Sequence, residues 1–223
     1  MVYIGAGKKG KEIHVTQEKN AQGEAQESEA REGVAFAGAQ GVNAQGEAAA
    51  PAGSLDNIIL TGMPGAGKST LGVVLAKILN YDFLDADLYI QNKHGKTLQD
   101  IINERGPLGF LDVENEDLQE ICPYHTVVAT GGSAVYSTEA MQHFQRIGTV
   151  VYLQISYDSL VERLGDLQER GVVLKGGIGM SLAELYEERL PLYEKWAQVT
   201  VDVEGLSITD AAKKVAAALD SKK

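Results

Sequence analysis

Residues 57–70, NIILTGMPGAGKST, constrain the fold of this chain more than any other stretch. Branched apolar residues precede the pattern G-x-x-x-x-G-K-[ST], formed by Gly62, Gly67, Lys68 and Ser69, and a helical apolar pattern follows it. A strand, a glycine turn and a helix in this order direct backbone N–H groups and the helix N-terminus at phosphate groups. The lysine would reach the outer phosphates and the serine hydroxyl would bind Mg²⁺. The pattern predicts a nucleotide-binding site.

The alternative interpretation of this segment is a glycine turn with a surface lysine. The flanking strand and helix favour phosphate binding, because chance matches seldom have both. The residues expected to bind the nucleotide here are Gly62, Gly65, Ala66, Gly67, Lys68, Ser69 and Thr70.

Beyond residue 54, short apolar segments alternate with helical patterns. Strands are expected at 58–61, 81–84, 126–130, 149–155 and 199–203. They are apolar nearly throughout, which is typical of parallel strands covered on both faces. A helix is expected from residue 70 to 79, and two later helices at Ser181 with Glu184 and at Ser207 with Asp210, which have capping-box spacing. The alternation predicts an α/β fold of three layers, with a five-stranded parallel sheet between helices.

Residues 1–54 differ in composition from the rest. They are rich in Ala, Gly, Glu and Gln, repeat the sequence NAQGEA, and cannot bury enough apolar surface to offset the entropy of ordering. A literal G-x-G-x-x-G from Gly5 to Gly10 lacks the strand and helix that a dinucleotide site requires. We expect a disordered leader over 1–54 and one folded domain over 55–223.

Charge and cysteine content restrict the partners of the chain. A net charge of −11 argues against a nucleic-acid partner. No apolar run is long enough for a membrane span, and the single cysteine, Cys122, excludes an internal disulfide. We expect a cytoplasmic monomer that binds small molecules.

Two carboxylates, Asp85 and Asp87, end the second expected strand. Residues two apart in a strand point to the same side, so both could face a ligand at the carboxyl edge of the sheet. One carboxylate could hold Mg²⁺ through water while the other accepts a proton from an attacking hydroxyl. The alternative is an ordinary cap at a helix N-terminus.

From residue 57 to 219 the chain resembles the shikimate kinase family, small kinases with a P-loop, the phosphate-binding loop at residues 62–69. The resemblance rests on the separated motifs GMPGAGKST, LDADLYI, GPLGFLDVE, ATGGSAVYS, ERGVVL and ERLPLYEKWA. It implies a P-loop kinase fold with a mobile lid and transfer of the γ-phosphate of ATP to an alcohol. By resemblance, Lys68 stabilises the transferring group, Ser69 binds Mg²⁺, Asp85 assists the metal through water and Asp87 deprotonates the acceptor.

Three arginines have roles that the resemblance alone implies. Arg170, in an expected lid at about 166–180, would close over the phosphates as a third catalytic residue beside Lys68 and Asp87. Arg163 would lie against adenine, and Arg189 would bind the acceptor's carboxylate. Surface ion pairs are the alternative for Arg163 and Arg189, which have acidic neighbours on expected helices.

Two positions depart from the family pattern in the expected acceptor pocket. Leu111 stands where the family has an arginine that helps to hold shikimate, and Ser133 stands in place of a third glycine. Glu114 then lacks its usual cation, while Arg189 is retained. The residues expected to bind the acceptor are Asp87, Leu111, Glu114, Gly131, Gly132, Ser133 and Arg189.

An acidic group beside a carboxylate-binding arginine suits an acceptor with both an ammonium and a carboxylate. We therefore expect a hydroxy amino acid such as homoserine to be the acceptor. Shikimate itself is the alternative, with the leucine being drift in a working enzyme. A catalytically inactive nucleotide-binding module and an NTPase that transfers phosphate to water are further alternatives.

Overall fold

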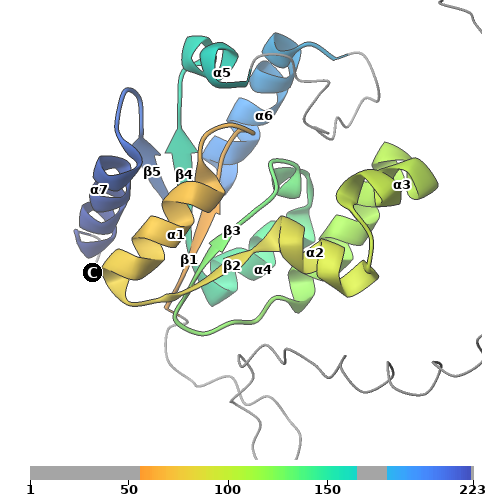
Figure 1. Ribbon diagram of the computed structural model, residues 1–223, viewed down its shortest axis with the longest axis horizontal. Coiled ribbons are helices and arrows are strands. Elements are labelled where there is room, and N and C mark those ends of the chain that lie inside the picture. Colours follow the sequence, from red (N-terminus) through yellow and green to blue (C-terminus); the bar gives the residue numbers. More distant parts are fainter. Residues whose placement is uncertain (1–55, 165–179, 222–223) are drawn as a thin grey trace, which may run out of the picture. The chain divides into compact units, whose positions relative to one another are not determined.

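The computed structural model describes residues 56–164 and 180–221, which Figure 1 shows as a ribbon. The expected leader and all but the last residue of the expected lid lie outside these residues. In chain order the elements are β1 (Asn57–Thr61), α1 (Lys68–Leu79), β2 (Asp82–Asp85), α2 (Ala86–His94), α3 (Leu98–Glu120), β3 (Thr126–Ala129), η1 (Ala134–Tyr136), α4 (Thr138–Ile147), β4 (Gly148–Gln154), α5 (Tyr157–Leu164), α6 (Leu182–Trp196), β5 (Val199–Asp202) and α7 (Ile208–Asp220).

The strands form one five-stranded sheet in the order β2-β3-β1-β4-β5, and every neighbouring pair is parallel. All five expected strands are present, with their ends displaced by at most one residue. Figure 1 shows α1 and α7 on the near side of the sheet and α4 behind it. The predicted α/β architecture is confirmed. The strand that leads into the P-loop, β1, is the central one.

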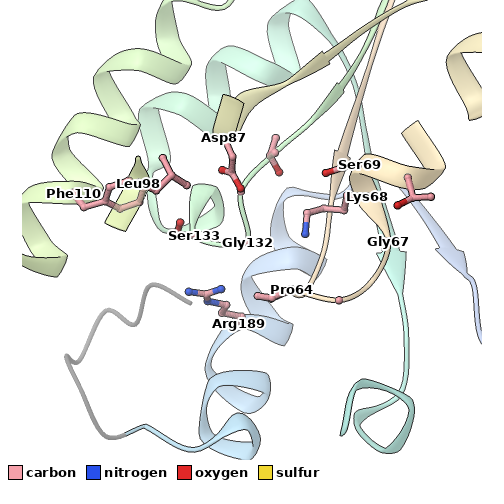
Figure 2. Close-up of a pocket in the computed structure, with 14 residues that line it drawn as sticks. Pro64, Gly67, Lys68, Ser69, Asp87, Leu98, Phe110, Gly132, Ser133 and Arg189 are labelled. Atoms are coloured by element: carbon pink, nitrogen blue, oxygen red, sulfur yellow. The ribbon is translucent and has the colours of Figure 1, made fainter. Parts of the chain in front are cut away.

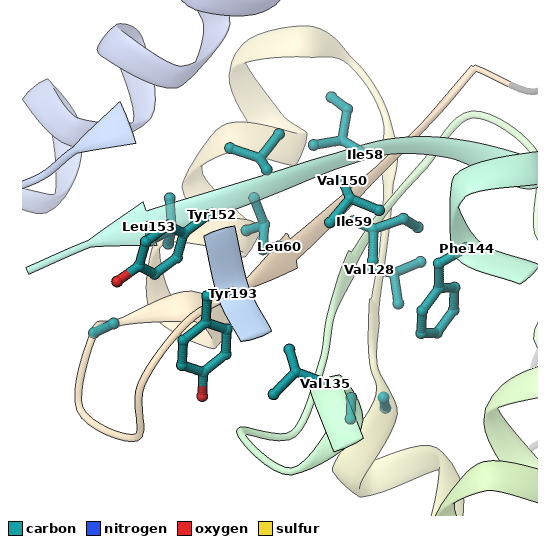
Figure 3. Close-up of a cluster of buried hydrophobic side chains, with 14 of the residues drawn as sticks. Ile58, Ile59, Leu60, Val128, Val135, Phe144, Val150, Tyr152, Leu153 and Tyr193 are labelled. Atoms are coloured by element: carbon teal, nitrogen blue, oxygen red, sulfur yellow. The ribbon is translucent and has the colours of Figure 1, made fainter. Parts of the chain in front are cut away.

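The core lies between the central strands and the helices on either face. Ile59 is in register with Val128 of β3 and Val150 of β4, and all three are fully buried. Figure 3 shows them on the side of the sheet that faces Phe144 of α4. Burying a large apolar side chain stabilises the folded state by about 1.5–3 kcal/mol. This packing fixes the central strands whose ends carry the site.

Helix starts follow local capping chemistry. Ser181 and Glu184 form a reciprocal capping box at the start of α6, as their spacing predicted. The Ser207 hydroxyl accepts a hydrogen bond from the Asp210 N–H at the start of α7. Among the described helices, none combines the length and apolar character that crossing a bilayer requires.

Helix α3 is broken near its middle. Gly106 has φ 74° and ψ 168°, and Pro107 follows it, so two helical segments meet at an angle there. Only glycine adopts this backbone conformation at little cost, and proline cannot donate the backbone hydrogen bond that would continue the first segment. The second segment carries Phe110 and Glu114 and runs beside α4 and η1.

Candidate active site

A cavity of about 480 Å³ lies at the carboxyl ends of the central strands. Parallel sheets bind ligands at this edge, and the volume suits a small-molecule site. Figure 2 shows that its lining comes from the P-loop, α2, α3, the loop after β3, and α6. The lining residues are Pro64, Gly65, Gly67, Lys68, Ser69, Thr70, Asp87, Leu98, Phe110, Thr130, Gly131, Gly132, Ser133 and Arg189.

The P-loop has backbone geometry that only glycine supplies readily. Gly62 has φ 149°, and a Cβ there would lie 2.8 Å from the Leu153 carbonyl oxygen. Gly67, the N-cap of α1, has φ 91°. These conformations bring the loop back over the sheet and leave the first N–H groups of α1 facing the cavity, where an anion is favoured.

Five of the seven P-loop residues expected to bind nucleotide line the cavity: Gly65, Gly67, Lys68, Ser69 and Thr70. Gly62 and Ala66 are not lining residues. They shape the loop instead, since the Ala66 N–H donates to the Met63 carbonyl at 3.0 Å and the Gly62 carbonyl accepts from Lys68.

The Lys68 ammonium is held inside the P-loop. Its Nζ donates to the carbonyl oxygens of Gly62 at 2.8 Å and Met63 at 3.1 Å. Burial lowers the pKa of Lys68 to about 8, because desolvation disfavours the charged form more than nearby Asp87 and Asp85 favour it. The ammonium therefore loses its proton at a pH at which an exposed lysine would keep it.

A pH dependence of nucleotide use follows. Only the protonated form of Lys68 attracts phosphate, so kcat/KM for ATP is expected to fall about tenfold per pH unit above pH 8. Initial rates at subsaturating ATP from pH 6.5 to 9.5 measure this. In Lys68→Arg the guanidinium stays charged, so the decline should vanish although the overall rate is lower. A wild-type profile that is flat up to pH 9.5 would contradict the assignment.

The carboxylates of Asp85 and Asp87 have different roles. Asp85 ends the strand and caps α2, because its Oδ1 accepts from the backbone N–H groups of Asp87 at 3.0 Å and Leu88 at 3.2 Å. Asp87 lies in the first turn of α2, so the expected placement of both residues along one strand was wrong. Asp87 lines the cavity and Asp85 does not. The capping alternative holds for Asp85.

Burial raises the pKa of the Asp87 carboxyl, and Asp85 acts in the same direction while Lys68 opposes it. A carboxylate with a raised pKa is a stronger base than a solvated one. Figure 2 shows the Asp87 carboxylate facing into the cavity, on the same side as the Lys68 ammonium. This position suits a general base that accepts a proton from a bound alcohol.

Gly131 brings two carboxylates together. A Cβ on this residue would lie 2.7 Å from Asp87 Oδ1 and 2.7 Å from Glu114 Oε1, so both oxygens approach the same bare backbone carbon. Glu114 is 2% exposed, and its Oε1 accepts a hydrogen bond from the Ser133 hydroxyl at 2.8 Å. Burial raises the pKa of Glu114 to about 7, with the Ser133 bond opposing the rise. Ser133, which lines the cavity, thus supplies the polar partner of a buried acid that does not itself line it.

Arg189 is the largest fully buried side chain and still lines the cavity. Its Nε donates to the Tyr136 hydroxyl at 3.1 Å, and its Nη1 would lie 2.9 Å from a Cβ on Gly132. The Tyr193 hydroxyl donates to the Gly132 carbonyl at 2.8 Å, which fixes the same backbone from the other side. A buried cation at a cavity wall suits an anionic group of a ligand.

Glu114, like Gly62, Ala66 and Asp85, is not among the residues that line the cavity. Three further expected site residues are not brought into the cavity wall. Leu111 is half-buried against the hydrophobic core and does not line the cavity. Arg163 is exposed at the end of α5, within electrostatic reach of Glu204. Arg170 lies outside the described residues. The assigned roles of these three residues stay predictions.

Four lining residues were not predicted from the sequence: Pro64, Leu98, Phe110 and Thr130. Phe110 and Pro64 lie within motifs that were identified. Their positions next to expected site residues could have indicated that they line the site. Leu98 reaches the cavity from the start of α3, and its place depends on how α3 packs rather than on any local pattern.

Residues 64–220 match the shikimate kinase family. A shikimate kinase of Thermodesulfovibrio yellowstonii is 34% identical over 162 residues, covering 72% of this chain and 93% of that protein. One from Parabacteroides distasonis is 37% identical over 155 residues, covering 67% of this chain and 89% of its own length.

Comparison with solved structures indicates the same family. A solved shikimate kinase from Acinetobacter baumannii, in complex with shikimate, has a TM-score of 0.68 and 31% identity, and covers 76% of this chain and 95% of its own. A second, from Bacteroides thetaiotaomicron, has a TM-score of 0.63 and 31% identity, and covers 74% of this chain and 98% of its own. This chain belongs to the shikimate kinase family, and it is an ATP-dependent phosphotransferase with an alcohol as acceptor.

Proposed function

We propose that this protein is a shikimate kinase, which transfers the γ-phosphoryl group of ATP to a hydroxyl of shikimate. One observation carries the proposal: Lys68, Asp87 and Arg189 line a single cavity at the carboxyl edge of the sheet. A phosphate-binding cation, a base and a carboxylate-binding cation are what phosphorylation of a hydroxy acid requires. The relatives named shikimate kinase support this acceptor over the hydroxy amino acid that the sequence led us to expect.

The triphosphate would lie on the N–H groups of the P-loop and the start of α1. Lys68 would exchange its loop carbonyl partners for phosphate oxygens and offset the charge that develops in transfer. The Ser69 hydroxyl lines the same cavity, and hydroxyl and carboxylate oxygens are ligands that suit Mg²⁺. Ser69 would hold the ion directly and Asp85 through water, and the ion would neutralise phosphate charge.

The acceptor would lie between Asp87 and Arg189. Its hydroxyl oxygen attacks the γ-phosphorus, the O–H proton passes to the Asp87 carboxylate, and the bond from phosphorus to the β-phosphate oxygen breaks to release ADP. Arg189 would bind the acceptor's carboxylate and so fix which hydroxyl faces Asp87. Arg170 would complete the phosphate site and Arg163 would lie against adenine, as the family resemblance implies.

A hydroxy amino acid such as homoserine is the second candidate acceptor. The observation that favours it is the Glu114 carboxyl, which is buried next to the lining residues Gly131 and Ser133 and accepts a hydrogen bond from the Ser133 hydroxyl. An acceptor ammonium would pair with the ionised form of Glu114, while Arg189 would bind its carboxylate.

Coupled ADP release with a panel of acceptors tests the proposal. Shikimate is expected to stimulate release at least tenfold over ATP alone, and homoserine is not. Stimulation by homoserine alone would establish the second candidate. Release that no acceptor stimulates, with ATP still bound, would indicate a nucleotide-binding module and overturn the proposal. Asp87→Asn gives the background rate for each acceptor.

A further inference from the structure

The orientation of Arg189 depends on residues that do not line the cavity. Tyr136, the last residue of η1, accepts a hydrogen bond from Arg189 Nε at 3.1 Å, and the guanidinium carbon lies 5.0 Å from the centre of its ring. Tyr136 is not among the lining residues. It therefore contacts the cation from behind, at the nitrogen farthest from the two terminal NH₂ groups that a carboxylate would meet.

The Tyr136 hydroxyl is polarised by its charged neighbours. Burial raises the pKa of Tyr136, the contact with Arg189 opposes the rise, and the negative charge of Glu188 on α6 adds to it. A guanidinium can only donate hydrogen bonds. The phenol oxygen must therefore accept from Arg189 through a lone pair.

We propose that Tyr136 and Arg189 form an orienting relay in which Tyr136 is the positioning residue that aims the guanidinium at the acceptor's carboxylate. The relay rests on the role proposed above for Arg189. A long side chain with several rotatable bonds loses affinity when its head group is free to turn, and a bond at Nε removes that freedom.

The relay explains how Arg189 can be buried and yet directed at a ligand. Its Nη1 packs against Gly132, where a Cβ would be only 2.9 Å away, so the guanidinium plane is held between η1 and the glycine backbone. Figure 2 shows the head group at the cavity wall beside Gly132. Tyr193 acts on the same guanidinium and donates to the Gly132 carbonyl at 2.8 Å, so two phenols hold this part of the cavity wall.

Tyr136→Phe tests the relay, because it keeps the ring and removes only the hydroxyl. The expected result is a rise of about tenfold in KM for shikimate, with KM for ATP unchanged and kcat changed by less than about threefold. Tyr186→Phe is the matched control: it lies on α6, and its hydroxyl donates to the Ile155 carbonyl rather than to an arginine. The control should leave both KM values within twofold. Equal effects of the two variants would overturn the proposal.

Measurements on the wild-type protein distinguish failure of this inference from failure of the proposed function. If wild type does not use shikimate, the proposed function fails, and the ratios are then measured with whichever carboxylate acceptor the panel identifies. If wild type uses shikimate but Tyr136→Phe has unchanged KM for it, the relay alone fails. Melting temperatures within about 3 °C of wild type exclude misfolding as the cause.

Discussion

Replacing Asp87 with asparagine is expected to lower kcat by about a hundredfold to ten thousandfold, the range over which a general base contributes. The amide has the shape of the carboxylate, but it cannot accept the proton of the acceptor hydroxyl. Asp85 still caps α2, so the helix that carries position 87 should be unaffected. Single-turnover phosphorylation of shikimate measures the change directly.

Nucleotide binding provides the internal control for this variant. KM for ATP should stay within about threefold of wild type, because the P-loop amides do not depend on Asp87. Asp82→Asn, at an exposed position on β2, should leave kcat unchanged. A kcat for Asp87→Asn within threefold of wild type would remove Asp87 as the base.

Replacing Gly131 with alanine is the second change with a large expected effect. The new methyl group would meet Asp87 Oδ1 and Glu114 Oε1 at 2.7 Å, closer than side chains approach one another. Because the backbone there does not have positive φ, the change strains the site rather than the chain. A displacement of about 1 Å in a reacting group can lower a rate about a hundredfold, and we expect a fall in kcat of that order.

The neighbouring glycine offers a contrast. A methyl group on Gly132 would meet Arg189 Nη1 and the ring of Pro64 instead of the two carboxylates. Gly132→Ala is therefore expected to raise KM for the acceptor more than it lowers kcat. If both variants changed KM and kcat in the same proportion, the assignment of Gly131 to the base and of Gly132 to the carboxylate-binding arginine would be wrong. Steady-state kinetics of the two variants, side by side, decide the matter.

The sheet and the phosphate site could be predicted from the sequence because their signals are local. Strands β1 and β3 are buried at every position and consist mostly of Ile, Leu, Val and Thr, so an apolar run alone indicates them. The P-loop glycines and Lys68 have fixed spacing, and the structure places them where that spacing predicts. Ser181 with Glu184 shows the same for a helix cap.

The rest of the site depends on packing between distant segments. Asp87 was identified, but its place on a helix rather than a strand follows from Asp85 capping α2, which strand alternation could not reveal. Tyr136 and Arg189 are 53 residues apart and meet only because η1 packs against α6. Leu111 packs against the core without lining the cavity, whereas its neighbour Phe110 belongs to the core and also lines the cavity.

The nucleotide site and the acceptor site are built from different elements around the central strand β1. The loop expected to hold the nucleotide follows the middle strand of the sheet, which is hydrogen-bonded to a neighbour on each side. The residues expected around the acceptor come instead from α2, from α3, from the loop after β3 and from α6. Substitutions in those elements can change the specificity for the alcohol while the ATP site stays unchanged.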